Sequence, residues 1–469
     1  MRHFHWRVAI VSSLALSAAQ FAQAQAVGAD VIVGNVADIT SHGVVGTVRS
    51  YSVGTTSCNI GDANVRWQTG NNFHPVISQN VYRLKNGRLE QIGMGWLKHG
   101  FTVAAGTFCS GPGGCTNTSS VILAPGCSDP YTGGLNGSQS RLGPRSDVNA
   151  STGVYPWPPT IGWVGTGSSG GTTGDAIFKR IQIQQADLDP AQNPGALYFG
   201  EGMYVSSDDA GTNGWNNASY RRATVSAAFA FTMQATTAQQ KPGIYAWPEN
   251  GLGAGVPDPN VHLNFVDVVN DGRFYVACKV TANTTPANTW HYEYAVENLD
   301  SHRSGGSFHV PLPAGANVVG TAGFKDINYH SGEPYDNTDW LKPVSSNEVV
   351  WTSPNSFAVD PLSNALRWST MYNFWFDCDQ PPVSGDVSIG LFRPGGVGEP
   401  DTVSVTGMLV PQAPPHCAGD LNGDNRTDEA DLGTLLSAWL SGAGGDLNGD
   451  NQTDESDLGI LLGDWGCIH

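Results

Sequence analysis

The C-terminal part of the sequence carries an acidic pattern that occurs twice, with Asp420 in the first copy matching Asp446 in the second. Each copy places side-chain oxygens at positions 1, 3, 5, 9 and 12 of a twelve-residue loop, and a main-chain carbonyl at position 7. Because Ca²⁺ takes six to eight oxygen ligands at about 2.3–2.6 Å, this spacing predicts one ion in each loop, two ions in all. The predicted ligands of the first loop are Asp420, Asn422, Asp424, the carbonyl of Arg426, Asp428 and Asp431. Those of the second loop are Asp446, Asn448, Asp450, the carbonyl of Gln452, Asp454 and Asp457.

The two loops depart from the usual calcium-loop pattern at two positions. Position 6, usually glycine, is Asn425 or Asn451, and position 12, usually glutamate, is aspartate. Asparagine tolerates the left-handed backbone conformation better than most residues, so we expect the sharp turn to survive. Aspartate is shorter than glutamate but can still ligate in a slightly rearranged loop. The competing interpretation is a solvated acidic tail without metal, which the repetition in register disfavours.

Each loop precedes apolar residues spaced for one face of a short helix. These residues are Leu432, Leu435, Leu436 and Trp439 in the first copy, and Leu458, Leu461, Leu462 and Trp465 in the second. One loop–helix unit is too small to bury such a face, so the two units are predicted to pack against each other around two ions. Cys417 and Cys467 bracket the duplication, and a bond between them would stabilise the module by about 3–4 kcal/mol through loop closure.

The paired loop–helix units resemble a bacterial type I dockerin, over roughly the last 50 residues. The resemblance implies a Ca²⁺-folded docking module, of the kind that secreted polysaccharide-degrading enzymes carry and that a cohesin binds. In that family, loop positions 10 and 11 help to select the partner. The resemblance therefore assigns partner binding to Glu429, Ala430, Glu455 and Ser456. Ser-Thr is common at these positions in the family, so a surface docking protein other than a standard cohesin is also open.

The first 26 residues are predicted to be a signal peptide, because Arg2 and Arg7 precede an apolar run and small residues follow at Ala22, Ala24 and Ala26. A membrane anchor is the alternative, but the run is shorter than the roughly 20 residues that span a bilayer. No later segment is long and apolar enough to do so. We therefore expect an extracellular protein, secreted by a bacterium and associated with a cell surface.

An oxidising compartment favours disulfides over catalytic thiols for the eight cysteines. The sequence does not determine their connectivity, although the groupings suggest four bonds. These are Cys58–Cys109, Cys115–Cys127, Cys278–Cys378 and Cys417–Cys467. A zinc site at Cys109, Cys115 and Cys127 competes with this prediction, but no Cys-x-x-Cys motif supports it.

The formal net charge of −18 argues against nucleic acid as a partner, because phosphate binding requires clustered Lys and Arg. Residues 417–469 hold 11 acidic side chains and one arginine, so they carry −10 of that charge. The rest of the chain is only mildly acidic.

The composition is low in charge and rich in glycine, proline and aromatic residues, which predicts a mainly β fold. We expect a β-sandwich-like body, of one or two domains, followed by a small α-helical, calcium-binding domain. Residues 27–240 are predicted to form a β-rich domain with a disulfide-stapled loop. Within it, Asn86-Gly87 separates two alternating runs and predicts a β-hairpin with a type I′ turn.

Residues 241–410 are predicted to form a second β-rich domain, with a weak resemblance to an immunoglobulin-like sandwich. Alternation over residues 288–300 predicts a strand with one buried aromatic face and one solvated face. A single core shared with the first domain is the alternative. Residues 411–416 read as a Pro-rich linker, and residues 417–469 as the separate dockerin-like module.

Several polar clusters in the body could do chemistry, and each also has a structural interpretation. His74 and His99 flank the hairpin and could share a pocket with Arg83 and Lys98, but isolated histidines are more often structural. The acidic candidates for glycosidic cleavage are Glu201, Asp208 and Asp209. The residues that could bind a metal, or could simply be polar side chains on a loop, are Asp326, His330, Glu333, Asp336 and Asp339. The candidates for stacking on sugar rings are Trp215, Trp247 and Trp340, although aromatic residues are more often core.

The sequence contains no serine-esterase, zinc-protease or phosphate-loop motif. The body resembles only uncharacterised exported β-rich bacterial proteins, so its catalytic residues are left unassigned. The leading prediction is a secreted protein held by its docking module to an extracellular partner. A role in polysaccharide breakdown, as a glycoside hydrolase or lyase, follows from the family association alone. The alternatives are a non-catalytic carbohydrate-binding or surface protein and a calcium-stabilised structural protein.

Overall fold

The computed structural model describes residues 26–100, 102–110, 114–161, 174–412, 417–424, 426–440 and 444–467. Nearly all of the predicted signal peptide, most of the predicted linker, and Asn425 lie outside these residues. The described chain is mainly β, as predicted, with four larger sheets and one sheet of two short strands. Within the same residues, no helix has the length and apolar character needed to cross a membrane.

Residues 31–233 supply two sheets that pack face to face. The first sheet has the order β1-β2-β10, and β8 also pairs with β2. Its strands are β1 (Val31–Val45), β2 (Val48–Asn59), β8 (Ser128–Tyr131) and β10 (Ile181–Gln184). β1 and β2 form a long antiparallel hairpin that turns at Gly46, whose positive φ of 58° costs a glycine little.

The second sheet has the order β13-β12-β11-β4-β6-β9, and β5 also pairs with β4. Its strands are β4 (Val76–Lys85), β5 (Arg88–Met94), β6 (Leu97–His99), β9 (Leu142–Gly143), β11 (Leu197–Val205), β12 (Ala218–Val225) and β13 (Phe231–Met233). The hairpin predicted at Asn86-Gly87 is confirmed: Lys85 pairs with Arg88, and both turn residues have the positive φ of a type I′ turn. The small separate sheet consists of β3 (Val65–Arg66) and β7 (Ile122–Leu123).

Residues 262–411 supply a third and a fourth sheet, which form a second sandwich. The third has the order β14-β15-β16-β20-β18, and the fourth has the order β19-β17-β21-β22. The third consists of β14 (His262–Asp267), β15 (Arg273–Ala282), β16 (Trp290–Asn298), β18 (Val318–Lys325) and β20 (Thr370–Cys378). The fourth consists of β17 (Gly305–Pro311), β19 (Glu348–Thr352), β21 (Pro382–Leu391) and β22 (Thr402–Pro411).

Short helical segments connect the strands of the body. The α-helices are α1 (Gly133–Asn136), α2 (Gln185–Leu188) and α3 (Ala246–Asn250). The 3-10 segments are η1 (Gln139–Arg141), η2 (Arg145–Asp147), η3 (Gly214–Asn216) and η4 (Gly243–Tyr245).

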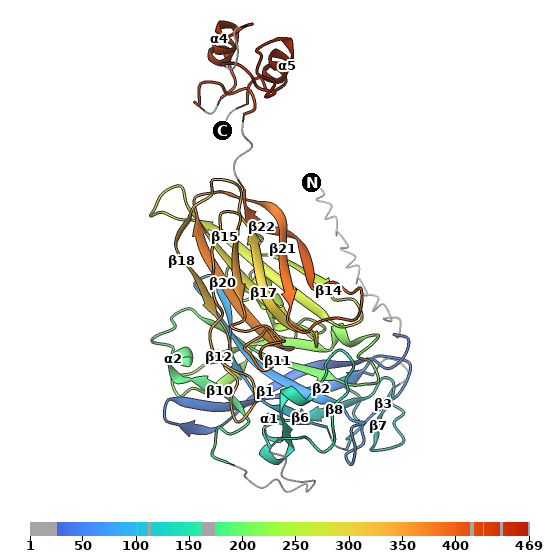
Figure 1. The fold of residues 1–469 in the computed structure, drawn as a ribbon. Helices are drawn as coiled ribbons and strands as arrows, with labels where there is room; N and C mark the ends of the chain where they lie inside the picture. Colours follow the sequence, from blue (N-terminus) through green and yellow to red (C-terminus); the bar gives the residue numbers. More distant parts are fainter. Residues whose placement is uncertain are drawn as a thin grey trace, which may run out of the picture.

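Three hydrophobic cores lie between the four sheets, and the middle core joins the two halves of the body. One core fills the first sandwich and another fills the second. The middle core combines residues of the second sheet, such as Tyr82 and Phe199, with residues of the third, such as Ala295 and Met371. Figure 1 shows the strands of the second sandwich standing above those of the first and running at a steep angle to them. The second and third sheets are therefore buried on both faces.

This arrangement corrects the prediction for residues 288–300. One face of β16 carries Tyr292, Tyr294 and Val296 in the core of the second sandwich, as expected. The opposite face was predicted to be solvated, but Glu293 and Glu297 are buried there with Ala295. The physical reason is the first half of the chain, because β5 packs against β16 and β20 on that side.

Three of the four suggested disulfides are present: Cys58–Cys109, Cys115–Cys127 and Cys417–Cys467. The fourth suggestion is wrong, because Cys278 and Cys378 are both free and buried. They lie on β15 and β20, with β16 between them, and their partners on β16 are Tyr294 and Trp290. Two strand spacings of about 4.8 Å already exceed the Cα separation of about 7 Å that a disulfide tolerates.

The C-terminal segment forms two short helices, α4 (Glu429–Ser437) and α5 (Glu455–Gly463), which contact each other. Each helix begins with a capping box, made by Asp428 with Asp431 and by Asp454 with Asp457. The predicted apolar faces are buried only in part. Leu435 and Leu461 are fully buried, but Leu436, Leu462 and Trp465 are exposed. Leu436 and Leu462 lie within the helices, so the contact between two short helices encloses only one leucine from each.

We expect thiol labelling of the denatured, unreduced protein to detect two free thiols, at Cys278 and Cys378. Labelling of the folded protein should be slow at both positions, because both side chains are buried. Peptide mapping by mass spectrometry identifies the labelled sites, and Cys278→Ala should leave a single reactive thiol. Labelling that finds no thiol in the denatured protein would contradict the arrangement of β15, β16 and β20.

Candidate functional site

The first acidic loop folds around its last aspartate. Asp431 Oδ1 accepts the N–H groups of Leu421, at 2.8 Å, and Asn422, at 3.1 Å. Its Oδ2 accepts the N–H of Asp428 at 2.9 Å, within the capping box of α4. The side chain of Asp431, at position 12, thus reaches back to the start of the loop. The same side chain takes part in the capping box at the start of α4.

The carboxylates of the first loop converge. Single oxygens of Asp420, Asp424 and Asp431 lie within 4.8 Å of one another. Three anionic groups this close repel one another, so the arrangement suits a cation that accepts oxygen ligands. Asn422 lies on the same loop, where its Oδ1 accepts the N–H of Asp424 at 2.8 Å. A second cluster of candidate ligands, Cys417, Cys467 and Asp464, is not available to metal because the two cysteines are bonded.

The second loop repeats this frame. Asp457 accepts the N–H groups of Leu447, Asn448 and Asp454 at 2.7, 3.1 and 2.9 Å. Asn451 has a φ of 68°, the left-handed conformation expected of position 6. Both carboxylate oxygens of Asp446 accept loop N–H groups, those of Gly449 and Asn451. Among the described residues, the aspartates of the second loop do not converge as closely as those of the first.

The residues at the predicted partner positions are accessible. Glu429, Ala430, Glu455 and Ser456 are all exposed, in the first turns of α4 and α5. The backbone N–H groups of Ala430 and Ser456 are used by the capping aspartates, at 2.8 Å in both copies. Their side chains are free to face a partner.

The histidine cluster of the body is a buried structural unit. His74 Nε2 lies 3.0 Å from His99 Nδ1, and both residues are 3% exposed. Burial lowers the pKa of His74 to about 4 and that of His99 well below its usual value, so both rings are neutral at physiological pH. Tyr155 and Trp157 pack against the pair. Lys98 is buried beside it, whereas Arg83 lies in a cavity described below.

The acidic candidates near residue 208 hold loops in place. Asp208 forms an ion pair with Arg66 at 2.5 Å. Asp209 is completely buried, and its Oδ2 accepts the N–H of Val31 and the amide of Asn217 at 2.9 and 3.1 Å. Burial raises the pKa of Asp209 to about 8. Both side chains are committed to structural contacts.

Glu201 belongs to a buried carboxyl pair that the sequence did not reveal. Its partner is Glu297, and the hydroxyl of Tyr82 lies 3.2 Å from one carboxyl and 3.3 Å from the other. The backbone N–H groups of Gly243 and Ile244 donate to the outer oxygens. Burial raises the pKa of both carboxyls, and each is 1% exposed. The pair lies in the middle core and no substrate can reach it.

The candidates between residues 326 and 339 do not form a metal site in the described residues. Glu333 accepts the backbone N–H groups of Arg145 and Ser146, and burial raises its pKa to about 7. His330 Nε2 lies 2.8 Å from the carbonyl of Met94, and burial lowers its pKa to about 4. Asp326 accepts the amide of Asn364 at 2.6 Å. The structure places Asp336 and Asp339 on an exposed stretch of the same segment.

Of the three tryptophans considered for sugar stacking, two are core residues. Trp247 and Trp340 are fully buried. Trp215 is 48% exposed, and the guanidinium of Arg273 lies 5.6 Å from its ring centroid. Only Trp215 keeps a face on which a ligand could stack.

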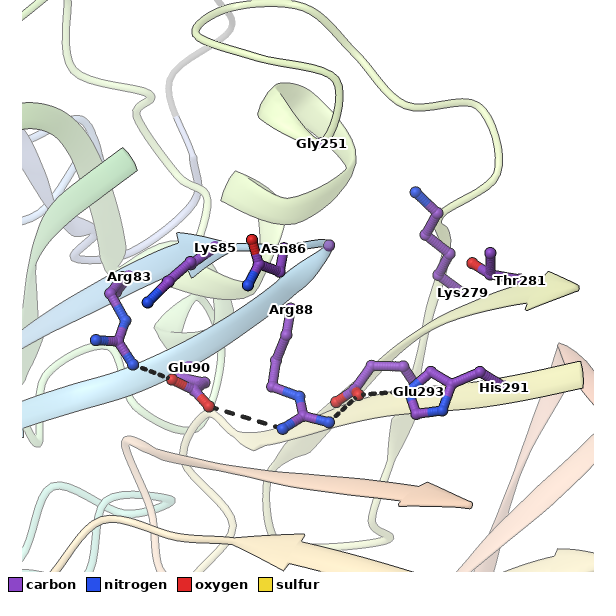
Figure 2. Close-up of a pocket in the computed structure, with 11 residues that line it drawn as sticks. Arg83, Lys85, Asn86, Arg88, Glu90, Gly251, Lys279, Thr281, His291 and Glu293 are labelled. Carbon is purple, nitrogen blue, oxygen red and sulfur yellow. Dashed lines mark hydrogen bonds and ion pairs between the residues drawn. The ribbon is translucent and has the colours of Figure 1, made fainter. Parts of the chain in front are cut away.

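The body contains a cavity of about 610 Å³ between the β4–β5 hairpin and strands β15 and β16. Figure 2 shows the hairpin side chains on one side of it and those of β15 and β16 on the other. The lining residues that carry charge or titrate are Arg83, Lys85, Arg88, Glu90, Lys279, His291 and Glu293. Of these, the sequence singled out only Arg83. Lys85, Arg88 and Glu90 lie on the same hairpin but carry no local motif, and Lys279, His291 and Glu293 come from strands about 200 residues further along the chain.

Ion pairs connect the charged side chains of the hairpin to one another and to β16. Arg83 pairs with Glu90 at 2.6 Å, and Arg88 pairs with Glu293 at 2.5 Å. The Arg88 guanidinium also stacks 3.7 Å from the ring centroid of Trp375. His291 lies 3.3 Å from Glu293, and this carboxylate and Asp377 raise the pKa of the ring. The wall is charged and rigidly organised.

A scan against protein-family models finds no match for this chain, and a search of the curated proteins finds no similar sequence. Functional inference therefore depends on the residues and the geometry described above.

We expect Glu297→Gln to stabilise the protein at about pH 8 by about 1–3 kcal/mol, with little gain at about pH 4. A carboxyl whose pKa is raised on folding binds its proton more tightly in the folded state. This tighter binding stabilises the folded protein fully below the pKa of the carboxyl in the unfolded state, about 4.3. The stabilisation is lost as the pH rises through the pKa of the carboxyl in the folded state. Glutamine cannot ionise, so it removes this loss. Denaturant unfolding followed by tryptophan fluorescence measures the difference.

The matched control is Asp386→Asn, which removes one negative charge from an exposed position. It should leave the free energy of unfolding unchanged within about 0.5 kcal/mol at both pH values. A Glu297→Gln variant that is less stable than the parent at about pH 8 would show that Glu297 is ionised in the core.

Proposed function

We propose that residues 417–467 form a calcium-dependent docking module of the dockerin kind, which holds a secreted β-rich body to an extracellular partner. The observation that carries the proposal is the convergence of Asp420, Asp424 and Asp431 within 4.8 Å, in a loop whose ligand spacing is repeated in the second copy.

The donor set favours Ca²⁺ over other metal ions. All side-chain ligands are carboxylate or amide oxygens, which suit hard cations. Histidine is absent from both loops, and the two nearby cysteines are bonded to each other. A flexible loop with six oxygen groups also matches the larger Ca²⁺ better than Mg²⁺, which demands octahedral geometry and keeps several waters.

Calcium binding is coupled to folding of the module. Asp431 and Asp457 each serve as position 12 of a loop and as a capping residue of the following helix. Only Leu435 and Leu461 of the helical apolar residues are fully buried, so the core is small. Ions that bind the folded loops but not the unfolded chain therefore add directly to the stability of the module.

A docking role is supported by the surface of the helices. Besides the four residues at the predicted partner positions, the apolar side chains of Leu436, Leu462 and Trp465 are exposed. Exposed apolar groups beside accessible polar ones are typical of protein interaction sites. The three disulfides, together with the lack of a membrane-spanning helix in the described residues, are compatible with an extracellular location.

For the body, binding is a better-supported role than glycosidic cleavage. Glu201 lies in a sealed core, Asp208 is paired with Arg66, and Asp209 is fully buried. None of them can act on a sugar in this arrangement. In the cavity, Glu90 and Glu293 are likewise held by arginines, as expected of a recognition surface.

We expect calorimetric titration of the full chain with Ca²⁺ to detect two binding sites. Asp424→Asn should weaken binding in the first loop, and Asp450→Asn in the second, each by at least about tenfold, because each removes one ligand charge. Asparagine retains the Oδ1 that accepts the N–H of Arg426 or Gln452, so loop folding is preserved.

The control is Glu429→Gln, which removes a neighbouring charge at position 10 without removing a ligand and should not change Ca²⁺ affinity. Chelation with EDTA should lower the melting temperature of the module. Titrations without heat in the parent protein, or melting that is insensitive to EDTA, would refute the calcium sites.

A further inference from the structure

We infer that the cavity between the β4–β5 hairpin and strands β15 and β16 binds an acidic sugar, meaning a polyhydroxylated ring that carries a carboxylate or sulfate group. The inference does not depend on the calcium module, because residues 417–467 contribute nothing to the cavity.

Basic side chains outnumber acidic ones in the lining of the cavity. Four basic side chains line the cavity, Arg83, Lys85, Arg88 and Lys279, against two acidic ones, Glu90 and Glu293. The whole chain has 23 Lys and Arg and a net charge of −18, so this local excess of positive charge is unusual in it. Carboxylates hold Arg83, Arg88 and Lys279, so the remaining positive charge, which attracts an anionic ligand, is that of Lys85.

One of the four cations, Lys85, has no carboxylate partner among the described residues. Arg83 also pairs with Asp187, and Lys279 pairs with Asp258 at 2.7 Å. Lys85 differs, because its Nζ donates only to the carbonyl of Gln192 and to the amide oxygen of Asn193, at 2.9 and 3.0 Å. Among the residues that the structure describes, no carboxylate lies within ion-pair distance of Lys85. Its charge is therefore available to an anionic group.

The cavity also offers hydrogen-bonding groups that suit the hydroxyl groups of a ligand. The side-chain amide of Asn86 and the hydroxyl of Thr281 both line the cavity and are exposed. Neither has a protein hydrogen-bond partner in the described part of the chain. Figure 2 shows Asn86 on the hairpin and Thr281 on β15, on opposite sides of the opening. An amide and a hydroxyl can each donate to and accept from the hydroxyls of a sugar ring.

The walls are also organised before a ligand arrives. The Arg88 guanidinium is held by Glu293 on one side and by the ring of Trp375 on its face. Arg83 is fixed by Glu90 and Asp187. A ligand therefore binds without ordering these long side chains, which would otherwise cost affinity.

The size of the cavity excludes simpler occupants. A volume of about 610 Å³ falls within the roughly 300–1,000 Å³ typical of small-molecule sites. A bare inorganic anion would fill little of it. An apolar ligand would leave the charged walls unsolvated, and a neutral sugar would make no use of Lys85.

The test is calorimetric titration of the full chain, with Ca²⁺ present, using four probes to millimolar concentration. They are D-glucuronate, D-glucose 6-sulfate, D-glucose and inorganic sulfate. We expect at least one acidic sugar to bind at least about tenfold more tightly than glucose or inorganic sulfate, since a charge-assisted hydrogen bond contributes about this factor. The comparison of the two acidic sugars identifies whether the anionic group is a carboxylate or a sulfate ester.

Two variants locate the site. Lys85→Gln should weaken binding of the acidic sugar by about tenfold, and Thr281→Val by a smaller factor, because it removes a neutral hydrogen bond. Thr281 is exposed and Lys85 is half-buried, and neither belongs to a hydrophobic core, so both variants should remain folded at the temperature of the titration, which thermal melting checks. The matched control is Lys342→Gln, which removes an exposed lysine that does not line the cavity and should leave affinity unchanged.

Three outcomes would overturn the inference. They are the absence of binding by both acidic sugars, equal affinity for glucose or inorganic sulfate, and unchanged affinity in a folded Lys85→Gln variant. Loss of calcium binding in the C-terminal module would not affect any of these measurements.

Discussion

The second and third sheets face each other across the middle core, so a charged group that is buried between them must find its partners inside the protein. Arg145 illustrates this constraint. Its buried guanidinium donates to the carbonyls of Gly95, Ser369 and Gln79 and to the side chain of Asn80, at 2.8–3.2 Å. A buried charge without such partners costs several kcal/mol. Since the partners come from both halves of the chain, this network sets how one sandwich sits on the other.

The cavity follows from the same packing. Where the second and third sheets face each other, the centre is closed by apolar residues and by the Glu201–Glu297 pair. Toward the edge, the hairpin bearing Arg88 meets the strand bearing Glu293, and the charged side chains reach solvent. The buried carboxyl groups of Glu201 and Glu297 thus form contacts between the two halves of the body. In the cavity, the carboxylates of Glu90 and Glu293 instead hold arginine side chains in place.

The sequence predicts well the features that depend on neighbouring residues. The Asn86-Gly87 turn arises from adjacent residues, and the Cys115–Cys127 bond joins residues only 12 positions apart. It fails where a distant segment changes the environment. The charged residues of β16 suggested a solvated face, but Glu297 is satisfied by Tyr82 and Ile244, which no local pattern indicates. Cys278 and Cys378 looked like a pair only because both stood apart from the other cysteines, and an intervening strand separates them.

The Cys417–Cys467 bond has a mechanical consequence. The module joins the rest of the chain through Cys417, and the bond ties this point to the segment that follows α5. A pulling force applied to α5 can pass through Cys467 to Cys417 along covalent bonds. It then bypasses the first acidic loop and α4, whose folded state depends on weaker contacts. Tension between α5 and the body therefore passes through the disulfide bond and not through the two acidic loops.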